Sequence, residues 1–503
     1  MMRKRTVLPL LGAVICAAST ALTSASGVVP ASVDARPGVS AQSVVSQGGF
    51  HVDWHPCQEA KDVQCGTLRV PVNWSRPHGD QVSLAVARRP ADDPDRRVGA
   101  VFYNPGGPGD GGVQYVLHAD QVFTDAVRAR FDIVTMDPRG IGDSTPSFWC
   151  ELPALRRDDT TFPDSRKEFK QMRAYHARYG LSCLRGSGEL LRNGDTRTVA
   201  RDHDALRTAL GEDQVSWLAI SYGVQIAAQY ADLYPEHTRA LVLDANLDHS
   251  QSEINALTTE IQAVEGVFDR FISWCATDET CALKGQDVGA VYDQLVRRAD
   301  RHPIPVRGAL RPVTGDDIRM NTPAYLGFKY PTIFGEDKSW AGLSRMIKAA
   351  VAGNAEGFAM PSQADSHELD GRLGNACMDY QSDVETWSDM QQRMEMARQL
   401  APHLQGGSEL WEALRCSDWP IPPSNPPRRL DIRHVPALIV NATHDPSTSY
   451  TAALSMADQI RDSHLLTRVG DGHTSYYTSR CAQRAEERFL IGVKAPASQV
   501  CVD

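Results

Sequence analysis

Ser221 lies in a short segment whose spacing could make its hydroxyl a nucleophile. It is the central residue of 219–223 (AISYG), between an apolar run at 215–220 and an amphipathic stretch at 222–233. A sharp turn from strand to helix exposes a serine hydroxyl at the carboxyl end of a sheet, and it needs small residues two positions before and after the serine. Alanine and glycine stand at those positions. The segment therefore predicts an activated serine, and a buried serine in a tight turn is the plainer alternative.

Two later segments could supply a general base and the acid that orients it. His473 lies in 470–474 (GDGHT) and Asp445 lies in 443–446 (THDP), each soon after an apolar run. A histidine can take the serine proton and return it to the leaving group, while a carboxylate holds the imidazole in the required tautomer. The chain order of serine, aspartate and histidine is that of α/β-hydrolases. Asp471 is the second candidate for the acid, less favoured because it shares the histidine's own loop.

Residues 104–109 (NPGGPG) could stabilise negative charge on a substrate carbonyl oxygen. They follow an apolar run at 99–103. Glycines let backbone N–H groups approach a substrate closely, so we expect the N–H of Gly107 and the N–H of Tyr222 to form an oxyanion hole. A simple Gly/Pro turn is the alternative. A phosphate-binding loop is disfavoured, because the segment lacks a GKS or GKT ending and its prolines cannot donate hydrogen bonds.

Five stretches carry a resemblance to a known family, namely 103–112, 131–144 (FDIVTMDPRGIGDS), 217–230, 437–450 and 470–481. They look like the secreted tripeptidyl aminopeptidases of actinobacteria and the similar mycobacterial carboxylesterase A type envelope hydrolases, both prolyl-iminopeptidase-like α/β-hydrolases. The likeness runs from about Trp54 to Cys501. It implies that the serine, aspartate and histidine above form the catalytic triad and that the glycine loop forms half of the oxyanion hole. The chain departs from the family at Ala219, where glycine is usual, and at Asp110, where small residues are common.

The substrate is left open between a peptide and an ester, since both reactions pass through an acyl-serine on this fold. An aminopeptidase would need a carboxylate for the substrate's free amine, and Asp379, Glu253 and Glu260 are candidates, although carboxylates on such helices are usually solvated. We favour an aminopeptidase that releases short, tripeptide-like N-terminal peptides. The alternative is a carboxylesterase acting on small or lipidic esters, and the remote alternative is an inactive secreted binding protein on a hydrolase scaffold. We expect no cofactor and no metal, and the oligomeric state stays unknown.

The elements that must position these residues alternate between strand and helix. Apolar runs predict strands at 99–103, 131–136, 215–220, 240–243, 437–440 and 465–469. Helical patterns lie between them at 199–210, 222–233, 451–460 and 484–490. This alternation is typical of a mostly parallel sheet. From 248 to 430 it gives way to a helical pattern, with a capping box expected at Ser382 and Glu385. We therefore expect an α/β-hydrolase core, 50–247 and 431–503, with a large and mainly helical cap, 248–430, inserted between core strands.

The N-terminal residues and the cysteines predict export. Residues 1–25 combine a basic start, an apolar run and a small-residue cleavage site, which is typical of a signal peptide, and 26–49 read as a flexible or propeptide segment. Removing Cys16 with the leader leaves an even number of cysteines, which favours disulfides in an exported chain. Pairing by local order gives Cys57–Cys65, Cys150–Cys183, Cys275–Cys281, Cys377–Cys416 and Cys481–Cys501. We expect a secreted protein, either extracellular or in the cell envelope.

Composition excludes two other classes of protein. The chain is 42% apolar and 23% charged, which indicates a globular fold. Its formal net charge is -10 with charges of both signs mixed along the chain, so a nucleic-acid binder is not expected. Outside the leader no apolar run is long enough to span a bilayer, so no transmembrane segment is expected.

Overall fold

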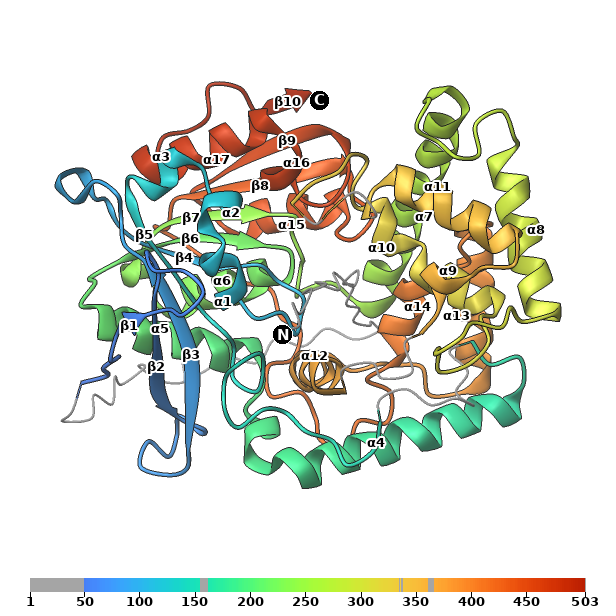
Figure 1. The fold of residues 1–503 in the computed structure, drawn as a ribbon. Coiled ribbons are helices and arrows are strands. Elements are labelled where there is room, and N and C mark those ends of the chain that lie inside the picture. Colours follow the sequence, from blue (N-terminus) through green and yellow to red (C-terminus); the bar gives the residue numbers. More distant parts are fainter. Residues whose placement is uncertain (1–48, 154–161, 334, 336–337, 361–365, 503) are drawn as a thin grey trace, which may run out of the picture.

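One sheet of ten strands forms the centre of the computed structural model, which describes residues 49–153, 162–333, 335, 338–360 and 366–502 (Figure 1). The strands are β1 (His55–Pro56), β2 (Gln64–Pro71), β3 (Gln81–Arg89), β4 (Gly99–Asn104), β5 (Phe131–Met136), β6 (Val215–Ile220), β7 (Thr238–Asp244), β8 (Ala437–His444), β9 (Ser463–Asp471) and β10 (Val500–Val502). Their order is β1-β2-β3-β5-β4-β6-β7-β8-β9-β10. The strands from β5 to β10 are parallel, and β1 to β3 form an antiparallel extension.

Helices cover both faces of this sheet, which explains why its central strands are continuous apolar runs. Strands β4, β5 and β6 are buried at every residue, as parallel strands covered on both faces must be. Phe102 and Trp217 belong to the core on one face, while Val101 and Leu218 belong to the core on the other. The core helices are α1 (Val113–Leu117), α2 (Ala119–Val122), α3 (Asp125–Arg128), α5 (Thr196–Leu210), α6 (Tyr222–Leu233), α15 (Tyr450–Gln459), α16 (Ser475–Thr478) and α17 (Arg480–Gly492).

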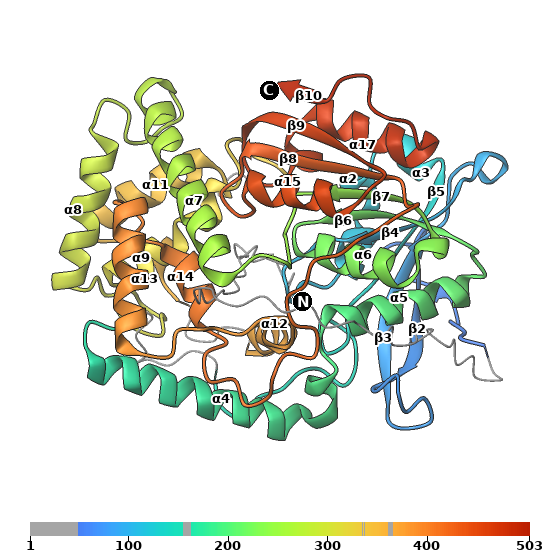
Figure 2. The same ribbon diagram turned by 180° about the vertical axis from the view of Figure 1, so that it is seen from behind.

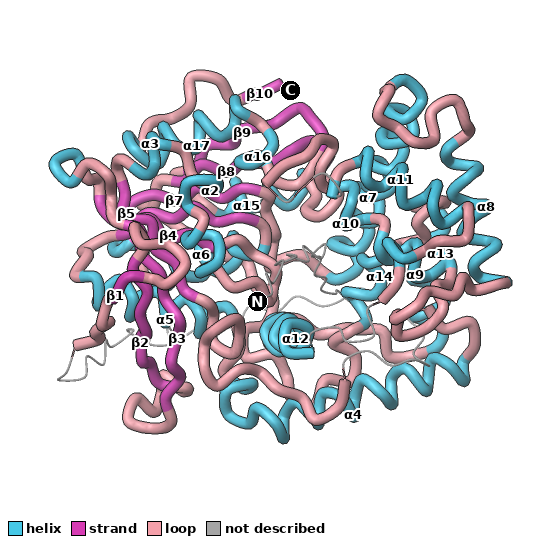
Figure 3. Tube along the Cα trace, in the orientation of Figure 1, coloured by secondary structure: helices cyan, strands magenta, loops and turns pink. Residues whose placement is uncertain are grey.

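The chain between β7 and β8 forms a helical lobe beside the core, with the strands confined to the core side in Figure 3. Its helices are α7 (Glu253–Thr277), α8 (Val288–Arg301), α9 (Gly315–Asn321), α10 (Pro323–Leu326), α11 (Trp340–Val351), α12 (Ser366–Asp379), α13 (Trp387–Leu400) and α14 (Gly407–Leu414). This lobe, here called the cap, has its own apolar centre around Phe268 and Trp340. The expected capping box at Ser382 and Glu385 is wrong, because the box forms one turn later, between Thr386 and Asp389 at the start of α13.

A long helix, α4 (Arg166–Arg192), connects the cap to the core and has no counterpart in the helices expected from sequence. It runs along one edge of the molecule, from below the cap to below the core, in both Figure 1 and Figure 2. Its inner face packs Phe169 and Met172 against cap helices and Tyr175 and Tyr179 against the core. Both lobes are therefore held by this one element.

The cysteines of the described chain form five disulfides, and these are the pairs expected by local order. The bond from Cys377 in α12 to Cys416 just after α14 closes the longest loop, with a sequence separation of 39. The expected signal peptide, including Cys16, and the following segment as far as residue 48 lie outside the described residues. Among the helices of the described chain, none has the length and apolar content needed to cross a membrane.

Candidate active site

Ser221 occupies a sharp turn between β6 and α6. Its backbone dihedrals are φ 55° and ψ -127°, outside the regions that most side chains adopt. Its N–H donates to the carbonyl oxygen of Asp244 at the end of β7, 2.9 Å away. The hydroxyl oxygen is buried and makes no hydrogen bond with any described residue. The turn thus presents a buried hydroxyl that is ready to accept or donate a hydrogen bond.

The glycine loop that follows β4 lies directly against this serine turn, because β4 and β6 are neighbours in the sheet. A Cβ on Gly106 would stand 2.7 Å from the carbonyl oxygen of Ile220 and 2.9 Å from the nitrogen of Tyr222, so only glycine fits there. The N–H of Gly106 donates to Asn104 Oδ1 (3.0 Å), whereas the N–H of Gly107 makes no hydrogen bond with the described chain. The strand order reverses between β4 and β6, which is where ligands bind in open α/β sheets.

His473 and Asp445 are brought together at the ends of β9 and β8. The ring nitrogen Nδ1 of His473 lies 2.9 Å from Asp445 Oδ2 and 3.0 Å from Oδ1. The carboxylate also accepts hydrogen bonds from the N–H groups of Ser447 (2.8 Å) and Thr448 (3.0 Å). The side chains of Asp445 and His473 are 1% and 8% exposed. Because Nδ1 is engaged by a carboxylate, Nε2 is the ring nitrogen left to act on a substrate or a nucleophile.

Asp471, the second candidate for the acid, has other partners. It forms ion pairs with Arg270 and Lys329, two residues of the cap. Burial would raise its pKa, but these two cations lower it below the usual value. The carboxylate of Asp471 therefore pairs with the cap and not with the imidazole of His473.

Asp244 ties the serine turn to the histidine loop. Its carbonyl oxygen accepts the N–H of Ser221, and its carboxylate accepts the N–H groups of Ser475 (3.0 Å) and Tyr476 (2.8 Å), two and three residues after His473. Sequence reasoning passed over this residue, because an aspartate at the end of a strand gives no signal of which loop it will bind. One side chain thus fixes two segments of the site relative to each other.

Two of the three candidate carboxylates for an amine are fully engaged inside the protein. Asp379 accepts hydrogen bonds from the Tyr222 hydroxyl (2.9 Å) and Asn425 Nδ2 (2.7 Å), and Glu253 accepts from the N–H of Asp383 (2.9 Å) and from Arg393 Nε (3.3 Å). The bond from Tyr222 joins the cap to the core, whereas the bonds of Glu253 lie within the cap. Together these bonds leave little capacity for a ligand.

Glu260, the third candidate, has one free oxygen. Its Oε1 accepts the N–H of Ser449 (3.0 Å), four residues after Asp445, whereas Oε2 is buried and makes no hydrogen bond with the described chain. Burial raises the pKa of Glu260 to about 8 despite the bond from Ser449, and the charges of Asp445 and Glu409 add to the rise. Burying a carboxyl oxygen without a hydrogen-bond donor costs free energy, so we expect Glu260 Oε2 to accept a hydrogen bond from a ligand.

Glu409 repeats this pattern on α14 and was missed by sequence reasoning. It is fully buried, its Oε1 accepts the Ser408 hydroxyl (2.9 Å), and its Oε2 has no partner among the described residues. Burial raises its pKa to about 8. An acid in the first turn of a helix is ordinarily a surface residue that complements the helix dipole, so the sequence carried no signal of this burial. Glu260 and Glu409 are here called the acidic pair of the cap, because the charge of Glu409 raises the pKa of Glu260; of the two, Glu260 also feels the charge of Asp445.

Asp110, the departure noted beside the glycine loop, lies close to the expected oxyanion site. A Cβ on Gly107 would stand 3.4 Å from the carboxyl carbon of Asp110. Burial raises the pKa of Asp110 to about 7, the charge of Glu368 adds to the rise, and Arg372 opposes it. The protonation state of this carboxyl therefore affects the electrostatic potential next to Gly107.

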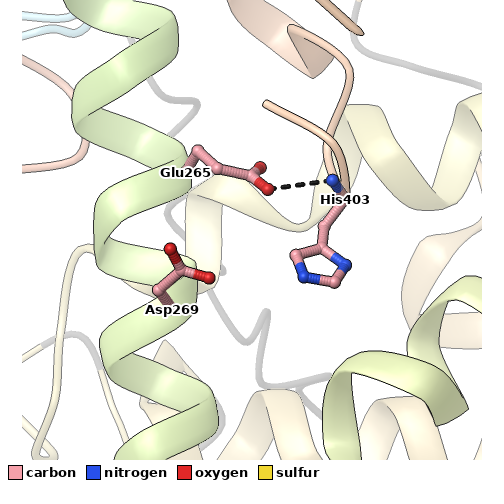
Figure 4. A group of neighbouring side chains, drawn as sticks. All are labelled: Glu265, Asp269 and His403. Atoms are coloured by element: carbon pink, nitrogen blue, oxygen red, sulfur yellow. Dashed lines mark hydrogen bonds between the residues drawn. The ribbon is translucent and has the colours of Figure 1, made fainter. Parts of the chain in front are cut away.

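A separate group of acids and a histidine lies within the cap, where Glu265 and Asp269 of α7 face His403 (Figure 4). Among the described residues, these three side chains have the spacing that could hold a metal ion. However, Glu265 accepts the N–H groups of His403 (2.8 Å) and Leu404 (3.1 Å), and His403 Nδ1 bonds to Asp293 (2.8 Å). These contacts fasten the loop before α14 to α7 and α8, and they account for the arrangement without an ion.

Comparison with known proteins places these features in a family. A family model described as the alpha/beta hydrolase fold matches residues 99–479. The chain is 30% identical over 487 residues to serine protease Hip1 of Mycobacterium tuberculosis (strain ATCC 25618 / H37Rv), covering 90% of each chain. It is 27% identical over 500 residues to tripeptidyl aminopeptidase of Streptomyces lividans, covering 93% of this chain and 89% of the relative. It is also 30% identical over 489 residues to carboxylesterase B of M. tuberculosis, covering 89% of each chain.

Proposed function

The chain belongs to the alpha/beta hydrolase fold family and is a serine hydrolase of the group that contains Hip1, tripeptidyl aminopeptidase and carboxylesterase B, and on this basis we propose that it is an aminopeptidase. It removes short peptides of about tripeptide length from unblocked N-termini. Ser221 is the nucleophile, His473 the general base and acid, and Asp445 the residue that orients the imidazole.

The proposed reaction proceeds through an acyl-enzyme. Ser221 Oγ attacks the carbonyl carbon of the scissile bond while Nε2 of His473 takes the hydroxyl proton, and Asp445 stabilises the imidazolium through Nδ1–H. The N–H groups of Gly107 and Tyr222 donate to the carbonyl oxygen as it becomes negative. His473 then passes its proton to the leaving amine, and the C–N bond breaks. Water, deprotonated by His473, releases the acyl group from Ser221 in the reverse sequence.

The acidic pair in the cap is the observation that favours a peptidase over an esterase. Glu260 and Glu409 each keep one buried oxygen without a partner among the described residues, and an ammonium group is a cation with several N–H donors of the kind that such an oxygen lacks. A substrate whose free amine binds this pair has its chain directed toward Asp445 and His473, because Glu260 is bonded to the backbone of Ser449 beside them. An uncharged ester offers no such group.

The disulfides support a place outside the cytoplasm. The five bonds of the described chain are of a kind that persists in oxidising compartments and is rare in the cytosol. We therefore propose that the enzyme is secreted and acts on extracellular or envelope peptides.

A comparison of matched substrates tests the proposal. Tripeptidyl anilides with a free amine and their N-acetylated forms are compared as substrates of the wild type and of Glu260→Gln. Acetylation is expected to lower kcat/KM of the wild type by more than about 30-fold, equivalent to about 2 kcal/mol, because it leaves the buried acidic pair unpaired. In Glu260→Gln the ratio of kcat/KM for the free substrate to kcat/KM for the acetylated substrate falls toward one. In the control Glu356→Gln, at an exposed position of the cap, this ratio stays at the wild-type value.

Short p-nitrophenyl esters test the second candidate, a carboxylesterase, which the 30% identity to carboxylesterase B supports. Ester hydrolysis that exceeds every peptide by orders of magnitude, with no effect of the Glu260 variant, would identify a carboxylesterase. Reaction with a fluorophosphonate that disappears in Ser221→Ala establishes an activated serine in either case. A wild type that fails to react would leave only an inactive binding protein on a hydrolase scaffold.

A further inference from the structure

Helix α4 carries an unusual concentration of positive charge for this acidic protein. Its 27 residues contain seven lysines and arginines and two glutamates, a net charge of +5 in a chain whose formal net charge is -10. Its exposed positions include six cations and no acid, namely Arg166, Lys167, Lys170, Arg178, Arg185 and Arg192. The rest of the molecule is therefore even more acidic than the total suggests.

Most of these cations have no anionic partner among the described residues, although Arg178 lies over the ring of Tyr175, 5.7 Å from its centroid. Arg185 pairs with Glu151, but Arg166, Lys167, Lys170, Arg178 and Arg192 make no ion pair or side-chain hydrogen bond with the described chain. The two acids of the helix are already used: Glu168 accepts the N–H of Asp164 (2.8 Å), and Glu189 accepts from Asn73 Nδ2 (2.8 Å). The charges of the outer face are thus unbalanced locally.

The stability of the helix does not explain the placement of these charges. Arg166 and Lys167 are the first two helical residues and Lys170 follows within the next turn, although the amino end of a helix favours negative side chains. The inner face already fixes the helix through Phe169, Met172 and the tyrosines that pack on the core. Cations at these positions oppose a local preference without a compensating contact, which is common at functional surfaces.

The exposed face is continuous and includes an apolar side chain. Positions 167, 170, 174, 178, 181 and 185 are separated by three or four residues, so they lie along one side of the helix, and all six are exposed. Leu181, at the fifth of these positions, is 44% exposed. Trp149 packs on Gly186 one turn further and is 47% exposed. Positions 167 to 185 precede the kink at Gly188, so at 1.5 Å per residue the face extends for about 27 Å along an open edge of the molecule (Figures 1 and 2).

We infer that this face of α4 docks the protein onto a lipid surface with anionic headgroups. Lysine and arginine on the polar flank of a helix, with leucine and tryptophan among them, are the features of segments that lie at such an interface. Charge complementarity orients the molecule, because the acidic remainder is repelled by the surface that attracts α4. The contact leaves Ser221 untouched, since α4 contributes no residue to the site described above.

Vesicle co-sedimentation of the purified protein tests the inference. Binding to vesicles of phosphatidylglycerol and phosphatidylcholine is compared with binding to phosphatidylcholine alone, at low and at 0.5 M salt. We expect at least tenfold stronger binding to the anionic vesicles, most of it lost at high salt. The triple variant Lys167→Glu, Lys170→Glu, Arg178→Glu should lose at least tenfold of this binding while it retains fluorophosphonate labelling at Ser221.

A matched control separates this face from a general charge effect. Arg480, Arg484 and Arg488 of α17 are also exposed, spaced by four residues and free of ion pairs with the described chain. Reversing these three charges changes the net charge equally and should leave vesicle binding within about twofold. An equal loss in the control, or no preference for anionic vesicles in the wild type, would overturn the inference.

The substitution Leu181→Ser distinguishes a lipid surface from a soluble anionic polymer. It should weaken vesicle binding several-fold, because it removes the apolar group that enters the interface. If Leu181→Ser has no effect and soluble polyphosphate displaces the vesicles completely, the face binds anionic polymers and the lipid inference is wrong.

Discussion

Ser221 shows how a single residue is held in a conformation it would not choose alone. Its positive φ costs on the order of 1–3 kcal/mol for a side chain with a Cβ. The hydrogen bond to Asp244 and the close approach of Gly106 keep it there. These contacts with the surrounding backbone offset the conformational cost when the protein folds. The hydroxyl is therefore positioned before a substrate binds.

The choice between two candidate acids gives the first prediction, at the scale of one residue. Asp445→Asn should lower kcat/KM on an activated ester by about 10⁴-fold, because an amide no longer selects the required tautomer of His473. Asp471→Asn should lower it less than about tenfold, since it breaks only ion pairs to Arg270 and Lys329. Steady-state kinetics of both variants checks this. Equal losses would transfer the role to Asp471.

Sequence patterns favoured Asp445 over Asp471 only because Asp471 shares the loop of His473, and the contacts that distinguish the two acids join residues far apart along the chain. Both stand near the ends of late strands, and each could reach the imidazole of His473. The difference is that Asp471 forms ion pairs with Arg270 and Lys329, which lie 201 and 142 residues earlier in the sequence. Glu409 escaped detection for the same reason, because its burial depends on packing against the rest of the cap. The serine and histidine motifs, in contrast, are local and visible in the chain.

At the scale of elements, the predictions succeeded where one segment carries its own signal. The strand Val215–Ile220 and the helix Tyr222–Leu233 have the bounds expected from the apolar run and the turn around Ser221. Helix α4 was not expected, because its apolar face is divided between two separate cores and its charges make it resemble a solvated segment. The capping box was misplaced by four residues, since serine, threonine, aspartate and glutamate all occur in that stretch.

The disulfide of α12 gives the second prediction. Replacing Cys377 and Cys416 by serine should lower the free energy of unfolding by about 4 kcal/mol, from the entropy of the released loop. Activity should also fall, because α12 carries Asp379, which accepts the hydrogen bond of the Tyr222 hydroxyl. Urea unfolding and ester hydrolysis measure the two effects.

The short disulfide between Cys57 and Cys65 is the control for that experiment. Its sequence separation is 8, so its loss should cost about 2–3 kcal/mol, and it lies on the strands at the far edge of the sheet. Its removal should leave activity on the ester unchanged. If this variant loses as much activity as the α12 variant, the link between α12 and the site is wrong.

At the scale of the whole molecule, buried carboxyls give the third prediction, which concerns pH. Glu260, Glu409 and Asp379 each have a pKa raised to about 8 by burial. The folded state therefore holds these protons more tightly than the unfolded state. Each such group contributes stability that is complete below its ordinary pKa and is lost as pH rises toward 8, by at most about 1.4 kcal/mol per pH unit.

We accordingly expect the free energy of unfolding to decrease between pH 5.5 and pH 8.5. Glu409→Gln should make this decrease smaller, since the amide has no proton to lose. Urea unfolding of both proteins at pH 5.5, 7.0 and 8.5, with the disulfides intact, provides the comparison. A slope that is the same in the variant would show that Glu409 is not held in its protonated form.

The arrangement of the lobes was accessible to sequence reasoning because the chain changes its pattern twice. Alternating strands and helices give way to helices after β7 and return at β8, which predicted a hydrolase core with an inserted cap. The contacts between the two lobes were not accessible, because they join single residues such as Glu260 and Ser449 across long separations.

Three of these contacts end on the loops that carry the proposed triad: the carbonyl of Gly327 accepts the N–H of His473, Glu260 accepts the N–H of Ser449, and Arg270 pairs with Asp471. The cap and the catalytic loops are therefore constrained to change together in evolution. A chimera that combines this core with the cap of a relative should fold and yet turn over slowly, until residues of the recipient loops are exchanged as well. New substrate preferences in this group are then expected to arise by paired changes in cap and loop, and seldom by replacement of the cap alone.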